Sequence, residues 1–134
     1  LPSSQGFNYL RLGQFAGSGI TESRVFALSQ GVLQINSIGL GSCGGGGIVY
    51  VSNGTVDLAT PFSVSFRARV LQEEIDTFTN SFGFGVYVRT GREAFGLGLG
   101  KSRIEGVSYN AISFDNTLFH DYRLDSQPGV GWQS

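Results

Sequence analysis

The sequence is poor in the residues that build disulfides, redox sites and metal centres. Its 134 residues include one cysteine, one histidine and no methionine. Because Cys43 is alone, a disulfide within the chain and a thiol cluster for a metal are both excluded. The single histidine, His120, likewise excludes a multi-histidine metal centre. These counts leave no metal centre built from several cysteines or several histidines.

Strong net charge and long apolar runs are also missing. Nine basic and ten acidic residues give a net charge of -1. The chain therefore lacks the cationic field that attracts nucleic acid or anionic lipid. No apolar run approaches the roughly 20 residues of a membrane-spanning helix. These absences predict no nucleic-acid partner and no membrane insertion.

Glycine and aromatic residues are abundant instead. The chain has 21 glycines, 11 phenylalanines and 5 tyrosines. Aromatic residues favour strands, and glycines in such number indicate many turns and bulges. No helix is strongly signalled, and the length suits one domain with a real core. The sequence therefore predicts an all-β protein with a single domain over residues 1–134.

The clearest strand follows Pro61 and covers residues 62–70. Apolar and polar residues alternate through it without a break, and side chains alternate between the two faces of a strand. One face carries Phe62, Val64, Phe66, Ala68 and Val70, and the other carries Ser63, Ser65, Arg67 and Arg69. This strand is expected to cover a core on one side and to meet water or a ligand on the other.

Shorter strand patterns, separated by glycine or polar turns, occupy much of the remaining chain. Such a series is typical of β-sandwiches and barrels. Two hairpins are predicted, one turning at Gln30-Gly31 and one across residues 90–93. The predicted strands cover residues 7–12, 23–29, 32–36, 48–51, 82–89, 94–100, 103–107, 108–113, 119–125 and 130–134.

The hairpin of residues 82–100 has one face that is nearly bare. Its polar-side positions include Gly83, Gly85, Gly96, Gly98 and Gly100. Glycine weakens a strand, so a run of glycines usually means that something approaches the backbone closely. Two interpretations remain open, a packed second layer and a sugar or partner that lies on this face.

Four segments carry a family resemblance, namely residues 23–36, Pro61 to Val70, the run Phe82-Gly-Phe-Gly-Val-Tyr-Val88, and the phrase Asp115-Asn-Thr-Leu-Phe-His-Asp-Tyr-Arg-Leu124. Together they resemble the concanavalin A-like lectin and glucanase superfamily, in particular the laminin-G-like and legume-lectin-like jelly rolls of bacterial secreted proteins. The resemblance implies an antiparallel β-sandwich of jelly-roll type. In the family this phrase is followed by a turn and a strand that ends in an Asp-Gly hairpin. The chain lacks that hairpin and everything after it, so a C-terminally incomplete domain is expected.

The resemblance also suggests a glucanase site. Glucanases of this superfamily carry the motif Glu-Ile-Asp-x-x-Glu on one strand, and Glu74 and Asp76 match its first two carboxylates. The third position is Thr79, whose hydroxyl cannot protonate a leaving sugar oxygen as a carboxylic acid does. Glu74 and Asp76 are therefore weak catalytic candidates, and catalysis is not the favoured function.

Metal and histidine chemistry offer few further candidates. Lectins of the resembled group often hold calcium in a loop of Asp and Asn oxygens, and Asp115 and Asn116 are such oxygen donors. Calcium is thus a candidate cofactor without a diagnostic ligand spacing, and no other cofactor is predicted. His120 lies near a strand end, where a structural role is expected, and no serine-hydrolase motif accompanies it.

Sugar binding needs aromatic faces that stack on pyranose rings and polar side chains that orient hydroxyls. The candidates for this role are Tyr87, Arg89, Arg67, Tyr109 and Trp132. Arg69 projects beside Arg67 on the long strand.

The favoured hypothesis is a non-catalytic, lectin-like carbohydrate-binding or cell-adhesion module of a bacterial extracellular protein, secreted or at the cell surface. Its partner would be a glycan or a cell-surface polysaccharide. The alternative is a structural surface or filament protein that self-associates by strand addition at an open edge. A β-glucanase-like glycoside hydrolase is the third hypothesis.

Overall fold

The computed structural model describes residues 1–40, 47–52, 54, 59–73, 84–89, 94–106, 111–127 and 131–133. Their contacts divide the chain into two compact units. Unit 1 holds the described residues from Leu1 to Gly54, and unit 2 holds those from Ala59 to Gln133. The expectation of a single domain stays a prediction.

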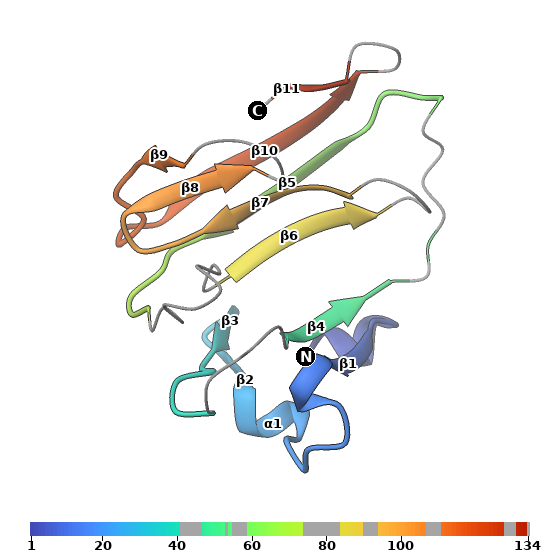
Figure 1. The fold of residues 1–134 in the computed structure, drawn as a ribbon, viewed down its shortest axis with the longest axis vertical. Helices are drawn as coiled ribbons and strands as arrows, with labels where there is room; N and C mark the ends of the chain where they lie inside the picture. The colour runs from blue at the N-terminus through green and yellow to red at the C-terminus, as the bar shows by residue number, and fades with distance from the viewer. Residues whose placement is uncertain are drawn as a thin grey trace. The chain divides into compact units, whose positions relative to one another are not determined.

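Unit 1 contains two small antiparallel sheets and one short helix (Figure 1). Strand β1 pairs with β4, and β2 pairs with β3. In the β2–β3 hairpin, Gln30 and Gly31 have positive φ angles of 52° and 77°, which suit a tight two-residue turn between strands. The elements are the 3-10 helices η1 (Pro2–Gln5) and η2 (Gly13–Phe15), the helix α1 (Glu22–Val25), and the strands β1 (Asn8–Leu12), β2 (Phe26–Ser29), β3 (Val32–Ile35) and β4 (Gly47–Val51).

Three aromatic rings hold unit 1 together. The ring centroid of Phe26 lies 4.6 Å from that of Tyr50 and 6.1 Å from that of Tyr9. The Tyr50 hydroxyl donates a hydrogen bond to Glu22, and this bond, with one from Ser3, holds the pKa of the Glu22 carboxyl below its ordinary value. Aromatic pairs of this kind add to burial, so the cluster fixes β1, β2 and β4 against one another.

Unit 2 consists of two antiparallel sheets with the strand orders β11-β10-β5 and β6-β7-β8-β9 (Figure 1). Strand β10 pairs with β5 from His120 opposite Ala68 to Asp125 opposite Ser63. The strands are β5 (Ser63–Ala68), β6 (Phe84–Arg89), β7 (Ala94–Leu99), β8 (Arg103–Gly106), β9 (Ile112–Ser113), β10 (His120–Gln127) and β11 (Gly131–Gln133).

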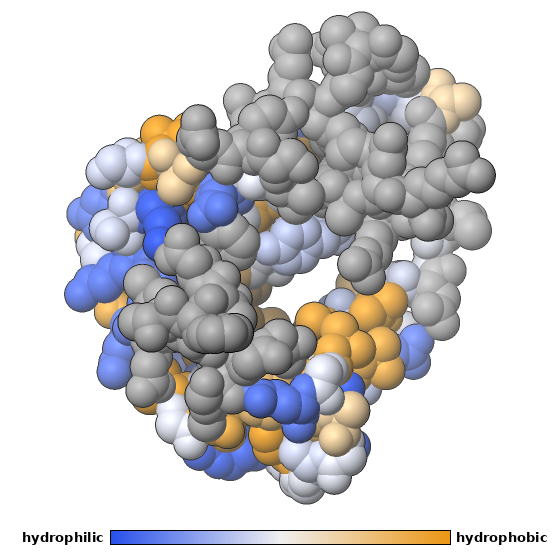
Figure 2. All heavy atoms as spheres, viewed as in Figure 1, coloured by the Kyte–Doolittle hydropathy of each residue, from blue (hydrophilic) through white to orange (hydrophobic). Residues whose placement is uncertain are grey.

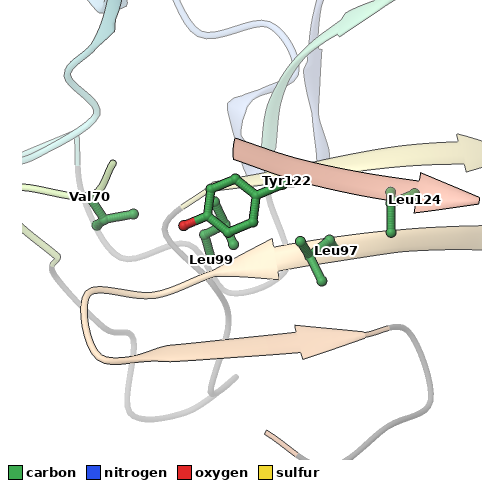
Figure 3. Packing of buried hydrophobic residues seen from close by; sticks show 5 residues of the cluster. All are labelled: Val70, Leu97, Leu99, Tyr122 and Leu124. Atoms are coloured by element: carbon green, nitrogen blue, oxygen red, sulfur yellow. The ribbon is translucent and has the colours of Figure 1, made fainter. Parts of the chain in front are cut away.

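The core of unit 2 is shared by both sheets. Leu97 and Leu99 come from β7, and Tyr122 and Leu124 come from β10 (Figure 3). Partly buried residues of both sheets pack against this cluster, namely Val64, Phe66, Ala68, Phe84 and Ile104. Leu99 has no exposed surface. The two sheets therefore pack face to face through apolar side chains, in a sandwich-like arrangement.

The structure confirms the all-β prediction and the alternation of the long strand. Burial alternates from exposed Ser63 to buried Val70 in the order expected, with the apolar residues inside. The hairpins at Gln30-Gly31 and between β6 and β7 are present. One segment differs, because Ser23 to Val25 belong to α1 and β2 begins only at Phe26. The jelly-roll topology stays a prediction.

Apolar and polar residues are mixed on the surface of the described residues, where orange and blue spheres adjoin (Figure 2). Leu28, Ile112 and Leu118 have exposed fractions of 62%, 64% and 65%. Single exposed apolar side chains of this kind are ordinary on protein surfaces. Within the described part of the chain, no helix has the length and apolar character needed to cross a membrane.

Candidate functional site

The outer face of the β5–β10 pair gathers polar and charged side chains into one surface. We call this surface the arginine face. Alternate residues of a strand share a face. The arginine face therefore takes every second residue from 63 to 69, which covers β5 and the residue after it, and every second residue from 119 to 125, which begins just before β10. It comprises Ser63, Ser65, Arg67, Arg69, Phe119, Asp121, Arg123 and Asp125.

At one end of the arginine face, three side chains form a closed hydrogen-bonded set. The Arg123 guanidinium contacts the Asp125 carboxylate with Nε to Oδ1 at 2.7 Å, and its Nη2 lies 3.0 Å from the Ser63 hydroxyl oxygen. The Ser63 hydroxyl donates to Asp125 at 2.5 Å. The hydrogen bonds from Ser63 and from Arg123 hold the pKa of the Asp125 carboxyl below its ordinary value.

At the other end, two guanidinium groups lie against one aromatic ring. The Cζ atoms of Arg69 and Arg67 are 4.5 Å and 5.8 Å from the ring centroid of Phe119. Arg67 also forms an ion pair with Asp121, at an N to O distance of 3.6 Å. Cation–π contacts of this kind stabilise by about 0.5–1 kcal/mol at exposed sites. Their main effect here is to orient the two guanidinium groups.

A shallow hollow lies between these two ends. Its volume is about 450 Å³, and it is lined by Ser65, Phe66 and Arg67 of β5 and by Asp121, Tyr122 and Arg123 of β10. Ser65, Arg67, Asp121 and Arg123 are exposed. The hollow thus offers a hydroxyl, two guanidinium groups and a carboxylate to a ligand.

The outer face of the other sheet carries Tyr87, and its ring covers two of the hairpin's glycines, Gly85 and Gly96. A Cβ atom added at Gly85 would lie 2.5 to 2.7 Å from three atoms of the Tyr87 side chain. One added at Gly96, directly opposite Tyr87, would meet the same ring and the Val86 carbonyl oxygen. Burial, with a smaller contribution from Glu105, raises the pKa of the Tyr87 hydroxyl. The group that approaches these glycines is a side chain of the hairpin itself.

This packing predicts unequal effects of alanine at the two glycines. Gly85→Ala displaces only a flexible ring, whereas Gly96→Ala also forces a methyl group to within 2.5 Å of a backbone oxygen. We expect Gly96→Ala to lower the free energy of unfolding by about 1–3 kcal/mol, as overpacking does, and Gly85→Ala to cost less. Urea titrations of both variants measure this. Equal losses in the two variants would contradict the packing described.

Asp115 and Asn116, the two calcium candidates, have different surroundings. Asn116 is fully buried, and its Oδ1 accepts a hydrogen bond from the Tyr122 hydroxyl at 2.6 Å. Asp115 is exposed, and its Oδ1 accepts hydrogen bonds from the Thr117 amide and hydroxyl at 2.9 and 2.6 Å. Both oxygens thus have partners within the chain. Among the described residues, no group of three or more His, Cys, Asp and Glu side chains is placed to hold a metal ion.

His120 and a partly buried ion pair each tie a loop to the rest of unit 2. The His120 Nε2 atom lies 2.9 Å from the Asp115 carbonyl oxygen, and its ring stands edge-on to Phe114. Glu73 lies 3.8 Å from Arg103 and accepts a hydrogen bond from the Lys101 amide at 2.8 Å. These contacts connect loops to strands, which fits a structural role.

The sugar-binding candidates do not all lie together. Arg67 is on the arginine face, whereas Tyr87 is on the outer face of the other sheet, so these two residues do not share a surface. Arg89 is in β6 and Trp132 is in β11, opposite Ser126. The sugar-binding candidate Tyr109 lies outside the described residues, as does Cys43. The catalytic candidates Glu74 and Asp76 lie outside them as well.

The sequence-based site missed four members of the arginine face, namely Phe119, Asp121, Arg123 and Asp125. Alternation within residues 119–125 places all four on one face. What it does not reveal is that β10 pairs with β5, more than fifty positions earlier in the chain.

Comparison with protein-family models, with curated proteins and with solved structures gives no match to this chain.

Proposed function

We propose that the chain is a non-catalytic carbohydrate-binding module that binds a glycan on the arginine face. The observation that carries the proposal is the row of paired guanidinium, carboxylate and hydroxyl groups across β5 and β10, with a hollow between its ends. A secreted or cell-surface location and a jelly roll of the concanavalin A-like type are parts of the same proposal.

The chemistry of the arginine face suits sugar hydroxyls. A hydroxyl group both donates and accepts, so neighbouring hydroxyls of a sugar match a surface that alternates guanidinium donors with carboxylate acceptors. Hydrogen bonds to charged groups are the stronger ones. Ser63, Asp125 and Arg123 already hold one another in place, which lowers the entropy lost when a ligand binds.

The spacing of the carboxylates argues against hydrolysis on this face. Asp121 and Asp125 are four strand residues apart, which corresponds to about 13 Å along β10. Retaining glycosidases need two carboxyl groups about 5 Å apart, and inverting ones need at most about 9.5 Å. Glu74 and Asp76, the glucanase candidates, lie outside the described residues, so the hydrolase hypothesis has no support from geometry.

A glycan array with and without calcium, followed by calorimetry on the best ligand, tests the proposal. Arg123→Ala removes a guanidinium from the hollow and is expected to weaken binding about tenfold, the effect of losing a charged hydrogen bond. Arg24→Ala is the matched control, because it removes an exposed arginine from unit 1. A blank array in both conditions would contradict the proposal, as would equal loss of binding in both variants.

A second candidate is structural self-association by strand addition. Among the described residues, β5 and β6 each have a hydrogen-bonded neighbour strand on one side only. An open edge is a template for another strand. Light scattering at rising protein concentration separates the two candidates, since strand addition predicts dimers or filaments and the binding module does not require them.

A further inference from the structure

We infer that the Phe119 end of the arginine face binds the anionic group of an acidic polysaccharide, a carboxylate or a sulfate. The inference rests on the proposed function and names its substrate class. It places the anion between the guanidinium groups of Arg67 and Arg69, which both contact the ring of Phe119.

Counted over the residues that the structure describes, positive charge is in excess at this end. Arg67 pairs with Asp121 at 3.6 Å, but none of the ion pairs among the described residues includes Arg69. Arg123 and Asp125 balance each other at the far end of the arginine face. Two guanidinium groups thus face one carboxylate around Phe119. Because like charges repel, an incoming anion lowers the electrostatic energy of this arrangement.

The arginines are accessible and oriented for such a ligand. The side chains of Arg67 and Asp121 are 63% and 77% exposed, and Arg69 is exposed as well. Contact with Phe119 holds the planar guanidinium groups without occupying their N–H donors. An arginine fork matches the two oxygens of a carboxylate or of a sulfate.

Binding at this end is expected to be sensitive to salt. Exposed charges are screened beyond about 10 Å at 0.1 M ionic strength, and an exposed ion pair stabilises by about 1 kcal/mol or less. A single acidic sugar should therefore bind weakly. A polysaccharide that repeats the anionic group gains avidity from repeated attachment.

The experiment compares polysaccharides that differ only in charge, using the whole chain at low and at physiological ionic strength. The probes are polygalacturonate and its methyl ester, and dextran sulfate and dextran, with binding followed by biolayer interferometry. A single-stranded oligonucleotide serves as a control polyanion, because its charges lie on phosphodiester linkages and not on carboxylate or sulfate groups of a polysaccharide. We expect at least about tenfold tighter binding to each acidic member of a pair, lost with added salt.

Three variants locate the effect. Arg69→Ala is expected to remove most of the preference for the acidic member, while Arg69→Lys keeps part of it because the charge remains without the planar fork. Arg24→Ala controls for the general loss of one positive charge. Circular dichroism confirms that each variant is folded.

The outcomes separate this inference from the proposed function. Equal binding of the acidic and neutral members overturns the inference and leaves the carbohydrate-binding module in place. Binding to none of the polysaccharides overturns both. A preference for acid that survives Arg69→Ala, or that is matched by the oligonucleotide, shows that the Phe119 end is not the selective site and also overturns the inference.

Discussion

Replacing Asn116 by alanine is expected to lower the free energy of unfolding of unit 2 by about 3 kcal/mol or more. The Asn116 side chain is fully buried and donates to the carbonyl oxygens of Gly100 and Arg103, at 2.6 and 2.8 Å, while it accepts from the Tyr122 hydroxyl. Alanine removes these three hydrogen bonds from groups that lie in the protein interior. Each buried group that loses its hydrogen bond costs about 1–3 kcal/mol.

The main chain of Asn116 lies where several segments of unit 2 meet. Its own backbone bridges two further segments, since its amide donates to Lys101 O at 3.0 Å and its carbonyl accepts from Val70 N at 2.8 Å. Asn116 thus connects the end of β5, the β7–β8 turn and β10. A buried, fully satisfied polar network of this kind specifies a single arrangement of the chain.

Urea unfolding followed by tryptophan fluorescence measures the loss, because the single tryptophan, Trp132, lies in β11 of unit 2. Ser113→Ala, at an exposed position of β9, is the control and should stay within about 0.5 kcal/mol of the wild type. Asn116→Asp keeps the shape but turns a donor toward two carbonyls into an acceptor, so it should be no better tolerated. Wild-type stability in either Asn116 variant would contradict the role described.

Leu99→Ala is expected to cost about 2–5 kcal/mol. Leu99 is the fully buried apolar side chain at the centre of the core of unit 2, where it packs with Tyr122, Leu97 and Val70 (Figure 3). Alanine removes three carbon atoms from a site enclosed by both sheets, and the cavity that remains adds to the lost transfer free energy.

Leu118→Ala is the matched control for this substitution. Leu118 is 65% exposed, so the same chemical change should alter the free energy of unfolding by less than about 0.5 kcal/mol. The comparison is made by urea titration under identical conditions. Similar losses in the two variants would show that β7 does not form the centre of the core.

The strands of unit 2 could be predicted from the sequence because their pattern is local. The alternation of Ser63 to Val70 decides which side chains of β5 face inward, and burial follows it residue by residue. The glycines that alternate with apolar residues along β6 and β7 likewise indicate that another group approaches the backbone closely. Such conclusions need only the two-residue period of a strand.

The role of Asn116 and the cover over the glycines depend on contacts that the sequence does not reveal. An Asp-Asn pair in a loop can hold a cation or close a core, and only the nearness of Gly100 and Arg103 shows the second role. Tyr87 stands opposite Gly96 because of the strand register. Register depends on the length and type of the turn, which the pattern of residues 90–93 does not fix.

The arginine face was likewise predictable only in part from the sequence. Arg67 and Arg69 were assigned to an exposed face from β5 alone, and this was correct. Their partners are Asp121 of β10 and Phe119 just before it, about fifty residues away in the chain. The pairing of β5 with β10 decides that a ring and a carboxylate meet these arginines. A composite surface of this kind is a product of tertiary structure.

The most direct test of the arginine face as a binding surface is an NMR titration of the labelled whole chain with a galacturonate oligomer and with a neutral glucan oligomer. Amide shifts concentrated in residues 63–69 and 119–125, saturating with ligand, are the result expected for a glycan bound across β5 and β10. Shifts centred on Tyr87 and Gly96 instead, or no shifts with either oligomer, would contradict the proposed function.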